Sequence, residues 1–273
     1  MIYSERLRVF LHALDGPDET GIAVQGDSVQ PDPAGTGVCA QPEHAAGISG
    51  ALPEGRTDDI PVPDRVSFAA FRREEEQAGI PIIRREMESF LQVLLELKQP
   101  RRILEVGAAE GFSSLWMASC TPQETVLTTI EQDPERIGRA REHFAMFPAG
   151  ERISLLEGDA QQILPALDGG SFDFVFMDAA KAQYIHFLPD VLHVMKKGGI
   201  LVSDNVLQDG VILEPGAAVE RRDRTIHRRM REYLKVLKQT DGLLTTVVPI
   251  GDGAAVTVKR KEICIDRDRL LNC

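Results

Sequence analysis

Acidic side chains stand at the ends of five segments with the near-continuous apolar character of buried strands. A carboxylate in such a place loses hydration, so it does not serve stability there. In a parallel sheet the carboxyl ends of the strands share one edge, and ligands bind beyond that edge. The acids therefore predict one ligand site, formed by Glu105, Glu131, Asp159, Asp178 and Asp204.

Asp178, Asp204 and Asn205 offer two carboxylates and one amide oxygen from two strand ends that we expect to be adjacent. Such oxygen ligands can fill one face of a hard cation, Mg²⁺ or equally Mn²⁺. The alternative is that Asp204 and Asn205 mark a turn and that Asp178 caps a helix. Lys181 comes one helical turn after Asp178, so its amine can reach the same site as a catalytic base, or it can simply pair with a carboxylate.

The segment "LEVGAAEGFSS" places Gly107 and Gly111 in a strand-to-helix turn without the glycine spacing of dinucleotide or phosphate loops. Glu131 follows Gly107 by 24 residues, about the distance at which an acid meets a ribose diol. An acidic pocket without a phosphate cradle suits a positively charged nucleoside such as S-adenosylmethionine. Asp159 and Ala160 would then border its adenine. A structural glycine turn with Glu131 as a solvated strand end is the alternative.

Six arginines lie between residues 221 and 231, although the whole chain has a formal net charge of −11. A basic helix next to a site can bind phosphate groups, and it can equally be a solvated face or a protein contact. His227 has no second histidine or cysteine near it in the sequence, which predicts a surface residue.

The elements that must position these residues alternate between strand and helix. Strands are predicted at 101–107, 125–133, 152–158, 172–178, 198–205, 243–251 and 253–261, with helices at 66–79, 84–98, 111–120, 134–147, 159–167, 182–195 and 219–238. This alternation predicts an α/β fold whose mainly parallel, seven-stranded sheet is covered by helices on both faces. The last two strands meet at a turn containing Gly251, Asp252 and Gly253, and they add an antiparallel edge.

Composition divides the 273 residues into four parts. We expect an N-terminal helix at 1–15, a flexible insert at 16–64, a catalytic domain at 65–262 and a tail at 263–273. Seven of the 16 prolines lie in the first 65 residues, without any periodic pattern. No apolar run approaches the roughly 20 residues that span a bilayer. No signal peptide is evident, and the four cysteines lack metal-ligand spacing, which predicts a cytoplasmic protein with reduced thiols and no membrane partner.

From about Val66 to Lys261 the chain resembles the metal-dependent class I O-methyltransferases of the catechol and caffeoyl-CoA type. The resemblance lies in "LEVGAAEGFSS", "TIEQD", "EGDA", "FDFVFMDAAKAQY", "GGILVSDNVLQDGVI" and "VPIGDGAAVTVKR", in this order. It implies the Rossmann-like class I methyltransferase fold, S-adenosylmethionine as cofactor, a divalent metal and a homodimer. The implied metal ligands are Asp178, Asp204 and Asn205. The resemblance implies donor contacts from Ser113, Glu131, Asp159, Ala160 and Asp178. We also expect Glu105, Gly107 and Gly111 to belong to the donor-binding site.

One departure concerns the substrate. Catechol and plant-type enzymes commonly read D-A-D-K where this chain has Ala180 between Ala179 and Lys181. "DAAKAQY", "IPIIRREMESFLQ" and "DNVLQDG" before an arginine-rich helix resemble the bacterial tRNA 5-hydroxyuridine methyltransferases. The resemblance implies methylation of the wobble 5-hydroxyuridine of tRNA to 5-methoxyuridine, and the candidate RNA contacts are Arg221, Arg222 and Arg228.

Two other departures and two alternatives stay open. The asparagine common in the family's last long helix is missing from "RTIHRRMREY", and Ala108 stands where threonine or serine is usual. A small catechol or other vicinal hydroxyl compound is the alternative substrate. An NAD-dependent oxidoreductase is the alternative from another enzyme class, and the missing third glycine weakens it.

Overall fold

The computed structural model describes residues 2–15 and 65–263. Helix α1 (Ile2–Asp15) and the part from residue 65 onward belong to one compact unit. The predicted insert at 16–64 and all but the first residue of the predicted tail lie outside the described residues. None of the helices described is both long and apolar enough to span a membrane.

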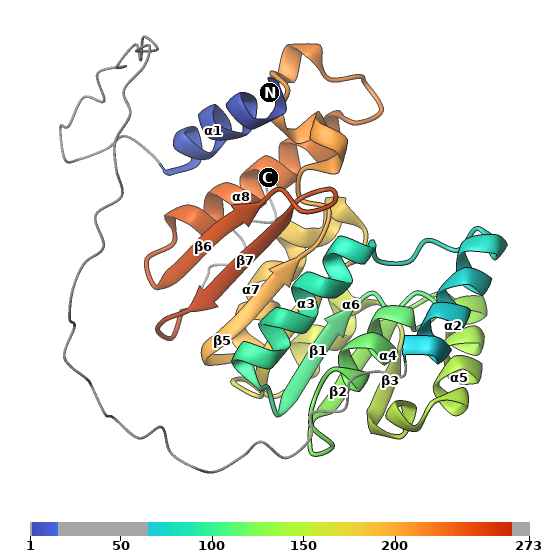
Figure 1. The fold of residues 1–273 in the computed structure, drawn as a ribbon. Helices are drawn as coiled ribbons and strands as arrows, with labels where there is room; N and C mark the ends of the chain where they lie inside the picture. Colours follow the sequence, from blue (N-terminus) through green and yellow to red (C-terminus); the bar gives the residue numbers. More distant parts are fainter. Residues whose placement is uncertain (1, 16–64, 264–273) are drawn as a thin grey trace, which may run out of the picture. The chain divides into compact units, whose positions relative to one another are not determined.

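A seven-stranded sheet forms the centre of the fold (Figure 1). Its order is β3-β2-β1-β4-β5-β7-β6, with the first five strands parallel and β7 antiparallel to both of its neighbours. This confirms the predicted fold class. The strands are β1 (Arg102–Val106), β2 (Val126–Glu131), β3 (Ile153–Glu157), β4 (Phe172–Met177), β5 (Met195–Ser203), β6 (Leu243–Val248) and β7 (Ala254–Lys259).

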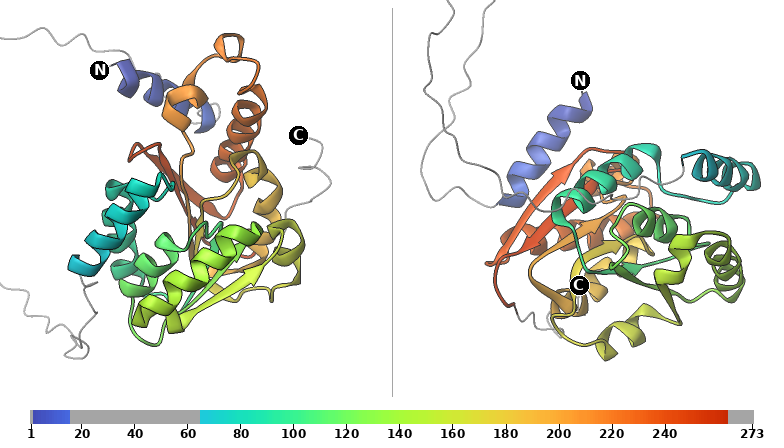
Figure 2. Two further views of the ribbon diagram at one scale, coloured as in Figure 1. Left: turned by 90° about the vertical axis from the view of Figure 1, so that its right-hand side faces the viewer. Right: turned by 60° about the horizontal axis from the view of Figure 1, so that its bottom comes forward.

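Side chains that alternate along the strands supply two apolar layers. Leu104, Val175 and Leu201 face one core, while Ile103 and Phe174 face the other. Helices cover both faces, and the left view of Figure 2 shows α3 and α8 on opposite sides of the sheet. The helices after α1 are α2 (Arg65–Ala78), α3 (Arg85–Lys98), α4 (Phe112–Ser119), α5 (Pro134–Met146), α6 (Ala160–Ile163), α7 (Tyr184–Val194) and α8 (Arg224–Gln239).

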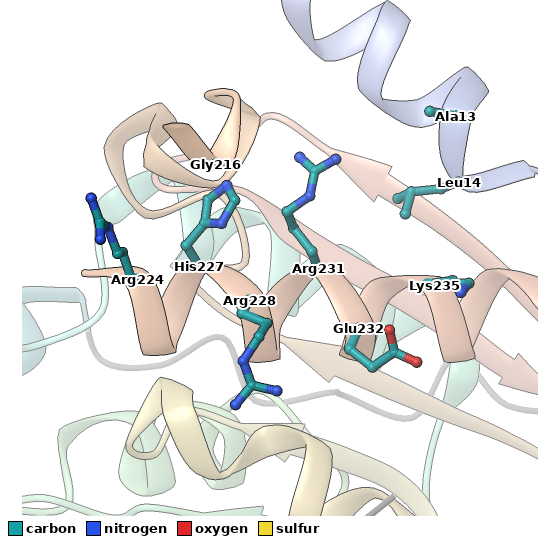
Figure 3. A pocket seen from close by; sticks show the side chains of 9 residues that line it. All are labelled: Ala13, Leu14, Gly216, Arg224, His227, Arg228, Arg231, Glu232 and Lys235. Atoms are coloured by element: carbon teal, nitrogen blue, oxygen red, sulfur yellow. The ribbon is translucent and has the colours of Figure 1, made fainter. Parts of the chain in front are cut away.

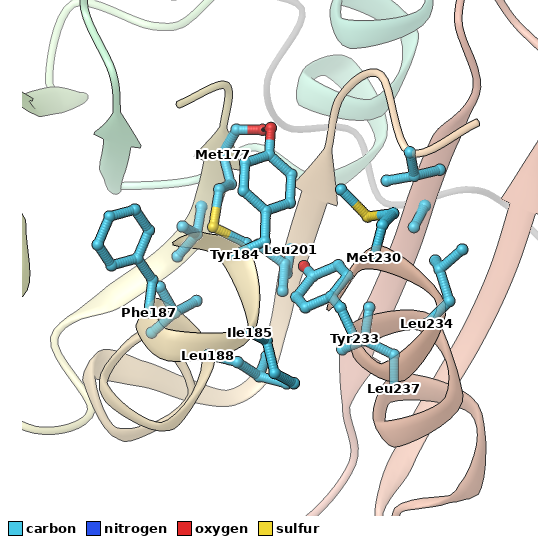
Figure 4. Packing of buried hydrophobic residues seen from close by; sticks show 14 of the residues in the cluster. Met177, Tyr184, Ile185, Phe187, Leu188, Leu201, Met230, Tyr233, Leu234 and Leu237 are labelled. Carbon is cyan, nitrogen blue, oxygen red and sulfur yellow. Dashed lines mark hydrogen bonds between the residues drawn. The ribbon is translucent and has the colours of Figure 1, made fainter. Parts of the chain in front are cut away.

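The core under α7 and α8 includes two buried tyrosines, Tyr184 and Tyr233, whose ring centroids lie 5.5 Å apart (Figure 4). Helix α1 packs on α8, where the Arg231 guanidinium lies 4.7 Å from the centre of the Phe10 ring. Leu234 and Leu237 of α8 belong to this core as well. The arginine-rich helix is therefore anchored on one side and exposed on another.

The order of strands reverses between β1 and β4, which is where α/β sheets bind ligands. The register pairs Val106 with Met177 and Met177 with Ser203. The residues that follow these three strand ends therefore lie at one level of the edge.

Two elements begin three or more residues away from their predicted first residue. Helix α8 begins at Arg224 rather than at residue 219, because Val219 is buried and a turn closed by the Asp223 N–H on the Glu220 carbonyl (3.0 Å) precedes the helix. Strand β5 begins at Met195 rather than at 198. Short 3₁₀ turns, which were not predicted, occur at Pro148–Arg152, Leu164–Ala166, Lys181–Gln183, Gln208–Leu213 and Gly216–Ala218.

Candidate active site

Gly107 closes the junction between the ends of β1 and β4. Its N–H donates to the Ile130 carbonyl (3.0 Å), and the Asp178 N–H donates to the Val106 carbonyl (3.0 Å). Its φ is +98°, and a Cβ at this position would lie 2.3 Å from the Asp178 carbonyl oxygen. Only glycine allows this approach, so Gly107 sets the position of the backbone at Asp178.

Glu105 lies beneath the glycine turn and is fully buried. Its carboxylate accepts hydrogen bonds from the hydroxyls of Ser113, Ser114 and Thr129. Burial raises the pKa of Glu105 to about 7, with a smaller contribution from the charge of Asp178. The expectation that Glu105 contacts the donor directly is corrected, because the side chain has no exposed surface. Ser113, itself nearly buried, is engaged with Glu105.

We expect Glu105→Gln to remove a pH-dependent part of the stability. The folded protein binds the Glu105 proton more tightly than the unfolded chain does. The contribution of Glu105 to stability is therefore complete below pH 4.5 and is lost as the pH rises to about 7. The free energy of unfolding of wild type minus that of Glu105→Gln should therefore fall by about 3 kcal/mol between these limits. Urea denaturation at several pH values measures this difference. Glu96→Gln, at an exposed position, is the control. If the difference in free energy of unfolding from wild type is independent of pH for both variants, the prediction is wrong.

Glu131 connects the end of β2 to the glycine turn. One carboxylate oxygen accepts the N–H of Ala109 (2.9 Å), and the other accepts those of Gln132 (2.9 Å) and Asp133 (3.0 Å). The residue is 8% exposed, so it is not a solvated strand end. Three N–H donors fix the position of the carboxylate at the edge of the sheet.

Asp159 and Ala160 follow the next strand, β3. The Asp159 side chain caps α6 by accepting the Gln161 N–H (2.9 Å). Both Asp159 and Ala160 are partly exposed. They lie at the carboxyl edge of the sheet, on the strand next to β2.

Asp178 and Lys181 form an ion pair, with 2.7 Å between Oδ1 and Nζ. Lys181 Nζ also lies 3.2 Å from the Tyr184 hydroxyl, which in turn contacts the main-chain carbonyls of Met177 (2.9 Å) and Asp204 (3.1 Å). Burial raises the pKa of Tyr184, so its hydroxyl remains protonated and donates to a carbonyl. The fold thus brings Asp178 and Lys181 together as predicted, and Lys181 also contacts the buried Tyr184.

Asp204 and Asn205 follow β5, the strand next to β4. Asp204 is 5% exposed, and burial, together with the charge of Asp178, raises its pKa. Asn205 has φ +55°, and its Nδ2 donates to Asp252 Oδ2 (3.3 Å), which leaves its amide oxygen as a free acceptor. The negative charges of the two carboxylates repel each other, and the free amide oxygen of Asn205 completes a set of three oxygen donors. Such a set fits a hard divalent cation.

Arg84 and Asp252 are neighbours of this site that were not predicted. Arg84 Nη2 donates to Asp252 Oδ2 (2.7 Å) and lies 3.7 Å from Asp209 Oδ1. The backbone of Asp252 and Gly253 also receives the N–H groups of the segment after Asn205. The sequence predicted only a turn here. An acid between two glycines beside the last strand was the available signal.

The candidate RNA contacts Arg221, Arg222 and Arg228 are exposed, and Arg222 forms an ion pair with Glu220 (3.1 Å). The prediction of His227 as a surface residue was wrong. The residue is 7% exposed, and its Nε2 lies 2.9 Å from the Glu214 carbonyl oxygen. A cavity of about 590 Å³ lies along α8 (Figure 3), and its lining is Ala13, Leu14, Gly216, Arg224, His227, Arg228, Arg231, Glu232 and Lys235.

Comparison with known sequences decides the family. The sequence model of the O-methyltransferase family matches residues 67–261, more than half of the chain. The chain belongs to the O-methyltransferase family. Its relatives and structural neighbours indicate that it is an S-adenosylmethionine-dependent enzyme.

Three similar proteins illustrate the range of this methyltransferase family. The catechol O-methyltransferase of Niastella koreensis is 34% identical over 143 residues, which is 50% of this chain and 65% of that protein, slightly less than two thirds of its length. The catechol O-methyltransferase of Mycobacterium tuberculosis is 31% identical over 57% of this chain and 72% of that protein. The O-methyltransferase TomG of Streptomyces achromogenes, involved in tomaymycin synthesis and solved in complex with S-adenosylmethionine, is 25% identical, with a TM-score of 0.63 over 71% of this chain and 90% of that one.

Proposed function

We propose that this methyltransferase acts on the wobble 5-hydroxyuridine of tRNA, with S-adenosylmethionine as donor and a divalent cation, Mg²⁺ or Mn²⁺, at the site. The observation that carries the choice of a polyanionic substrate is the contact between the basic helix and the catalytic segment. Arg229 of α8 donates from Nη1 to the carbonyl of Ala182 (3.1 Å), next to Lys181. RNA phosphates held by α8 would therefore lie close to the reacting group.

The donor site in this proposal lies over the glycine turn. Glu131 would accept the ribose hydroxyls, since its carboxylate is fixed by three N–H groups at the end of β2. Asp159 and Ala160 would border the adenine from the next strand. Gly107 and Gly111 let the turn pack closely against the Asp178 backbone and the Phe144 ring, and Glu105 with Ser113 supports the turn from below.

Asp178, Asp204 and Asn205 would hold the cation. When bound, it supplies Lewis-acid stabilisation of the ionised substrate hydroxyl and orients this hydroxyl with a neighbouring ring oxygen. The positive charge would favour the ionised form of Asp204, because it offsets the burial and the repulsion from Asp178 that raise the pKa of this side chain.

Lys181 would act as the base that accepts the hydroxyl proton. The resulting ammonium is stabilised by Asp178 at 2.7 Å and by a lone pair of the Tyr184 hydroxyl at 3.2 Å. The substrate oxygen then forms a bond to the methyl carbon as the carbon–sulfur bond breaks, so the sulfonium charge disappears. Most of the rate enhancement would come from holding oxygen and methyl near attack distance, about 3 Å.

A small catechol is the second candidate substrate. Two of the relatives reported above are named catechol O-methyltransferases, and a catechol has the same pair of neighbouring oxygens as 5-hydroxyuridine. Nucleoside mass spectrometry of tRNA from cells that lack the protein tests the choice. Accumulation of 5-hydroxyuridine supports the tRNA proposal, and an unchanged nucleoside profile rejects it.

Charge reversal at Arg228 should weaken tRNA methylation and spare small phenols. Each phosphate contact that is lost lowers the slope of log affinity against log salt by about 1. We expect Arg228→Glu to raise KM for tRNA by roughly 5- to 10-fold near 0.1 M salt, with further loss when Arg221→Glu and Arg222→Glu are added. Steady-state kinetics at several salt concentrations measures both quantities.

The control for this prediction is Arg136→Glu, which reverses an exposed arginine on α5. It should change neither the KM for tRNA nor the salt slope. If Arg228→Glu instead slows a catechol as much as it slows tRNA, α8 acts as a structural helix and the RNA role is wrong.

A further inference from the structure

Three ionisable side chains meet in the interior without contributing to the active site described above. They are Glu75 of α2, Glu110 of the glycine turn and His143 of α5. Glu75 is 4% exposed and Glu110 8% exposed. One ligand atom from each residue lies within 4.8 Å of the others, and His143 Nε2 is 3.7 Å from Glu75 Oε1.

Two of the carboxylate oxygens in this cluster are buried without a hydrogen bond, Glu75 Oε2 and Glu110 Oε2. Arg139 Nε lies 4.0 Å from Glu110 Oε2, beyond hydrogen-bond range, and the Arg139 side chain is half exposed. Unpaired buried carboxylate oxygens are costly. Burial raises the pKa of Glu75, in keeping with a group that lacks compensation. These oxygens therefore need a positively charged partner inside the cluster.

The orientation of His143 indicates which partner fits. Its Nδ1 lies 2.7 Å from the Glu110 carbonyl oxygen, which can only accept, so Nδ1 carries the proton. Nε2 of the neutral ring then directs its lone pair toward the carboxylates. Histidines that bind metals characteristically donate their other ring N–H to a carbonyl or carboxylate in this way. Without a cation or a second proton, Nε2 and Glu75 Oε1 would face each other as two acceptors.

We propose that Glu75, Glu110 and His143 bind a zinc ion that ties α2 to α5 and to the glycine turn. Two carboxylates and one imidazole nitrogen are a zinc donor set, with water as the fourth ligand, whereas Mg²⁺ prefers oxygen alone. Bonds of about 2.0–2.1 Å place tetrahedral ligand atoms about 3.3 Å apart, so small side-chain rotations suffice.

The ion would join segments that already touch. The rings of Phe71 on α2 and His143 on α5 are 4.7 Å apart, and Figure 1 shows the two helices side by side. Glu110 lies between Ala109, whose N–H is bound by Glu131, and Gly111, the residue that precedes α4. Zinc at this place would fix the turn that the donor approaches, while leaving the Asp178–Asp204 edge free for its own cation.

The test measures zinc binding in the full chain carrying Asp178→Asn and Asp204→Asn, so that the active-site ligands are removed. After treatment with a chelator and dialysis, this protein is titrated with Zn²⁺ alone. We expect one tightly bound equivalent by elemental analysis and calorimetry. At a hundredfold excess of zinc over its Kd, the melting temperature should rise by roughly 5–10 °C.

In the same double variant, His143→Gln should abolish both the bound zinc equivalent and the zinc-induced rise in melting temperature. His193→Gln, at an exposed position, should keep both. X-ray absorption at the zinc edge of the parent double variant gives a readout that does not depend on how His143→Gln folds. One imidazole with oxygen ligands supports the site. Sulfur ligands, no imidazole, or a bound equivalent that survives His143→Gln overturns the proposal, and His143 is then a protonated partner of the two carboxylates.

Discussion

Replacing Asp204 with asparagine is expected to lower kcat by about 10³-fold while raising the melting temperature of the metal-free protein by a few degrees. A bound cation that stabilises an ionising hydroxyl contributes several kcal/mol, and each 1.4 kcal/mol is about tenfold in rate. In the absence of the cation, Asp204 is a buried carboxylate beside the charge of Asp178. Removing its charge relieves that repulsion, and the Asn205 N–H can still donate to the amide oxygen of the new side chain.

The two effects of Asp204→Asn are measured separately, by methyl transfer at saturating Mg²⁺ and by thermal unfolding in the presence of a chelator. Asp168→Asn, a change at an exposed position, is the matched control and should alter neither quantity. Methyl transfer by Asp204→Asn that persists with chelator present would refute the role of the cation. A fall in the melting temperature would show that Asp204 is already compensated by a positive group in the metal-free protein.

The general architecture could be predicted because it depends on local patterns. Apolar strands alternating with amphipathic helices fix a mainly parallel sheet. The acids at the strand ends then meet at one edge, as the pairing of Met177 with Val106 and with Ser203 brings about. The adjacency of the strands that end at Asp178 and Asp204 and the closeness of Asp178 to Lys181 followed from this reasoning, and the resemblance added the nature of the donor.

Contacts between distant segments could not be predicted in the same way. Arg84 meets Asp252 across 168 residues, and no spacing in the sequence relates them. The burial of Glu105 depends on hydroxyls from α4 and β2 that meet only in the folded chain. His227 is different, because it precedes buried residues at helical spacing, Met230 and Leu234. Its burial could have been inferred from that periodicity, but the arginines around it led to the prediction of an exposed residue.

Gly107→Ala is expected to cost about 3–5 kcal/mol of stability, or roughly 10 °C in melting temperature, and to abolish donor binding. The added Cβ would lie 2.3 Å from the Asp178 carbonyl oxygen, and the residue would also have to keep φ near +98°. Since the obstacle is backbone rather than a flexible side chain, the ends of β1 and β4 must separate. Asp178 would move with the end of β4, so calorimetry should detect no binding of S-adenosylhomocysteine.

Gly79→Ala separates the two causes of this loss. Gly79 also has a positive φ, +73°, but a Cβ there would meet nothing within 4 Å. Gly79→Ala should therefore lower the stability only by the backbone strain of a left-handed alanine, about 1–2 kcal/mol, and leave donor affinity unchanged. Equal losses for the two alanine variants would mean that strain at positive φ accounts for both. A much larger loss for Gly107→Ala, accompanied by loss of donor binding, would show that the close approach of β1 to Asp178 builds the active site.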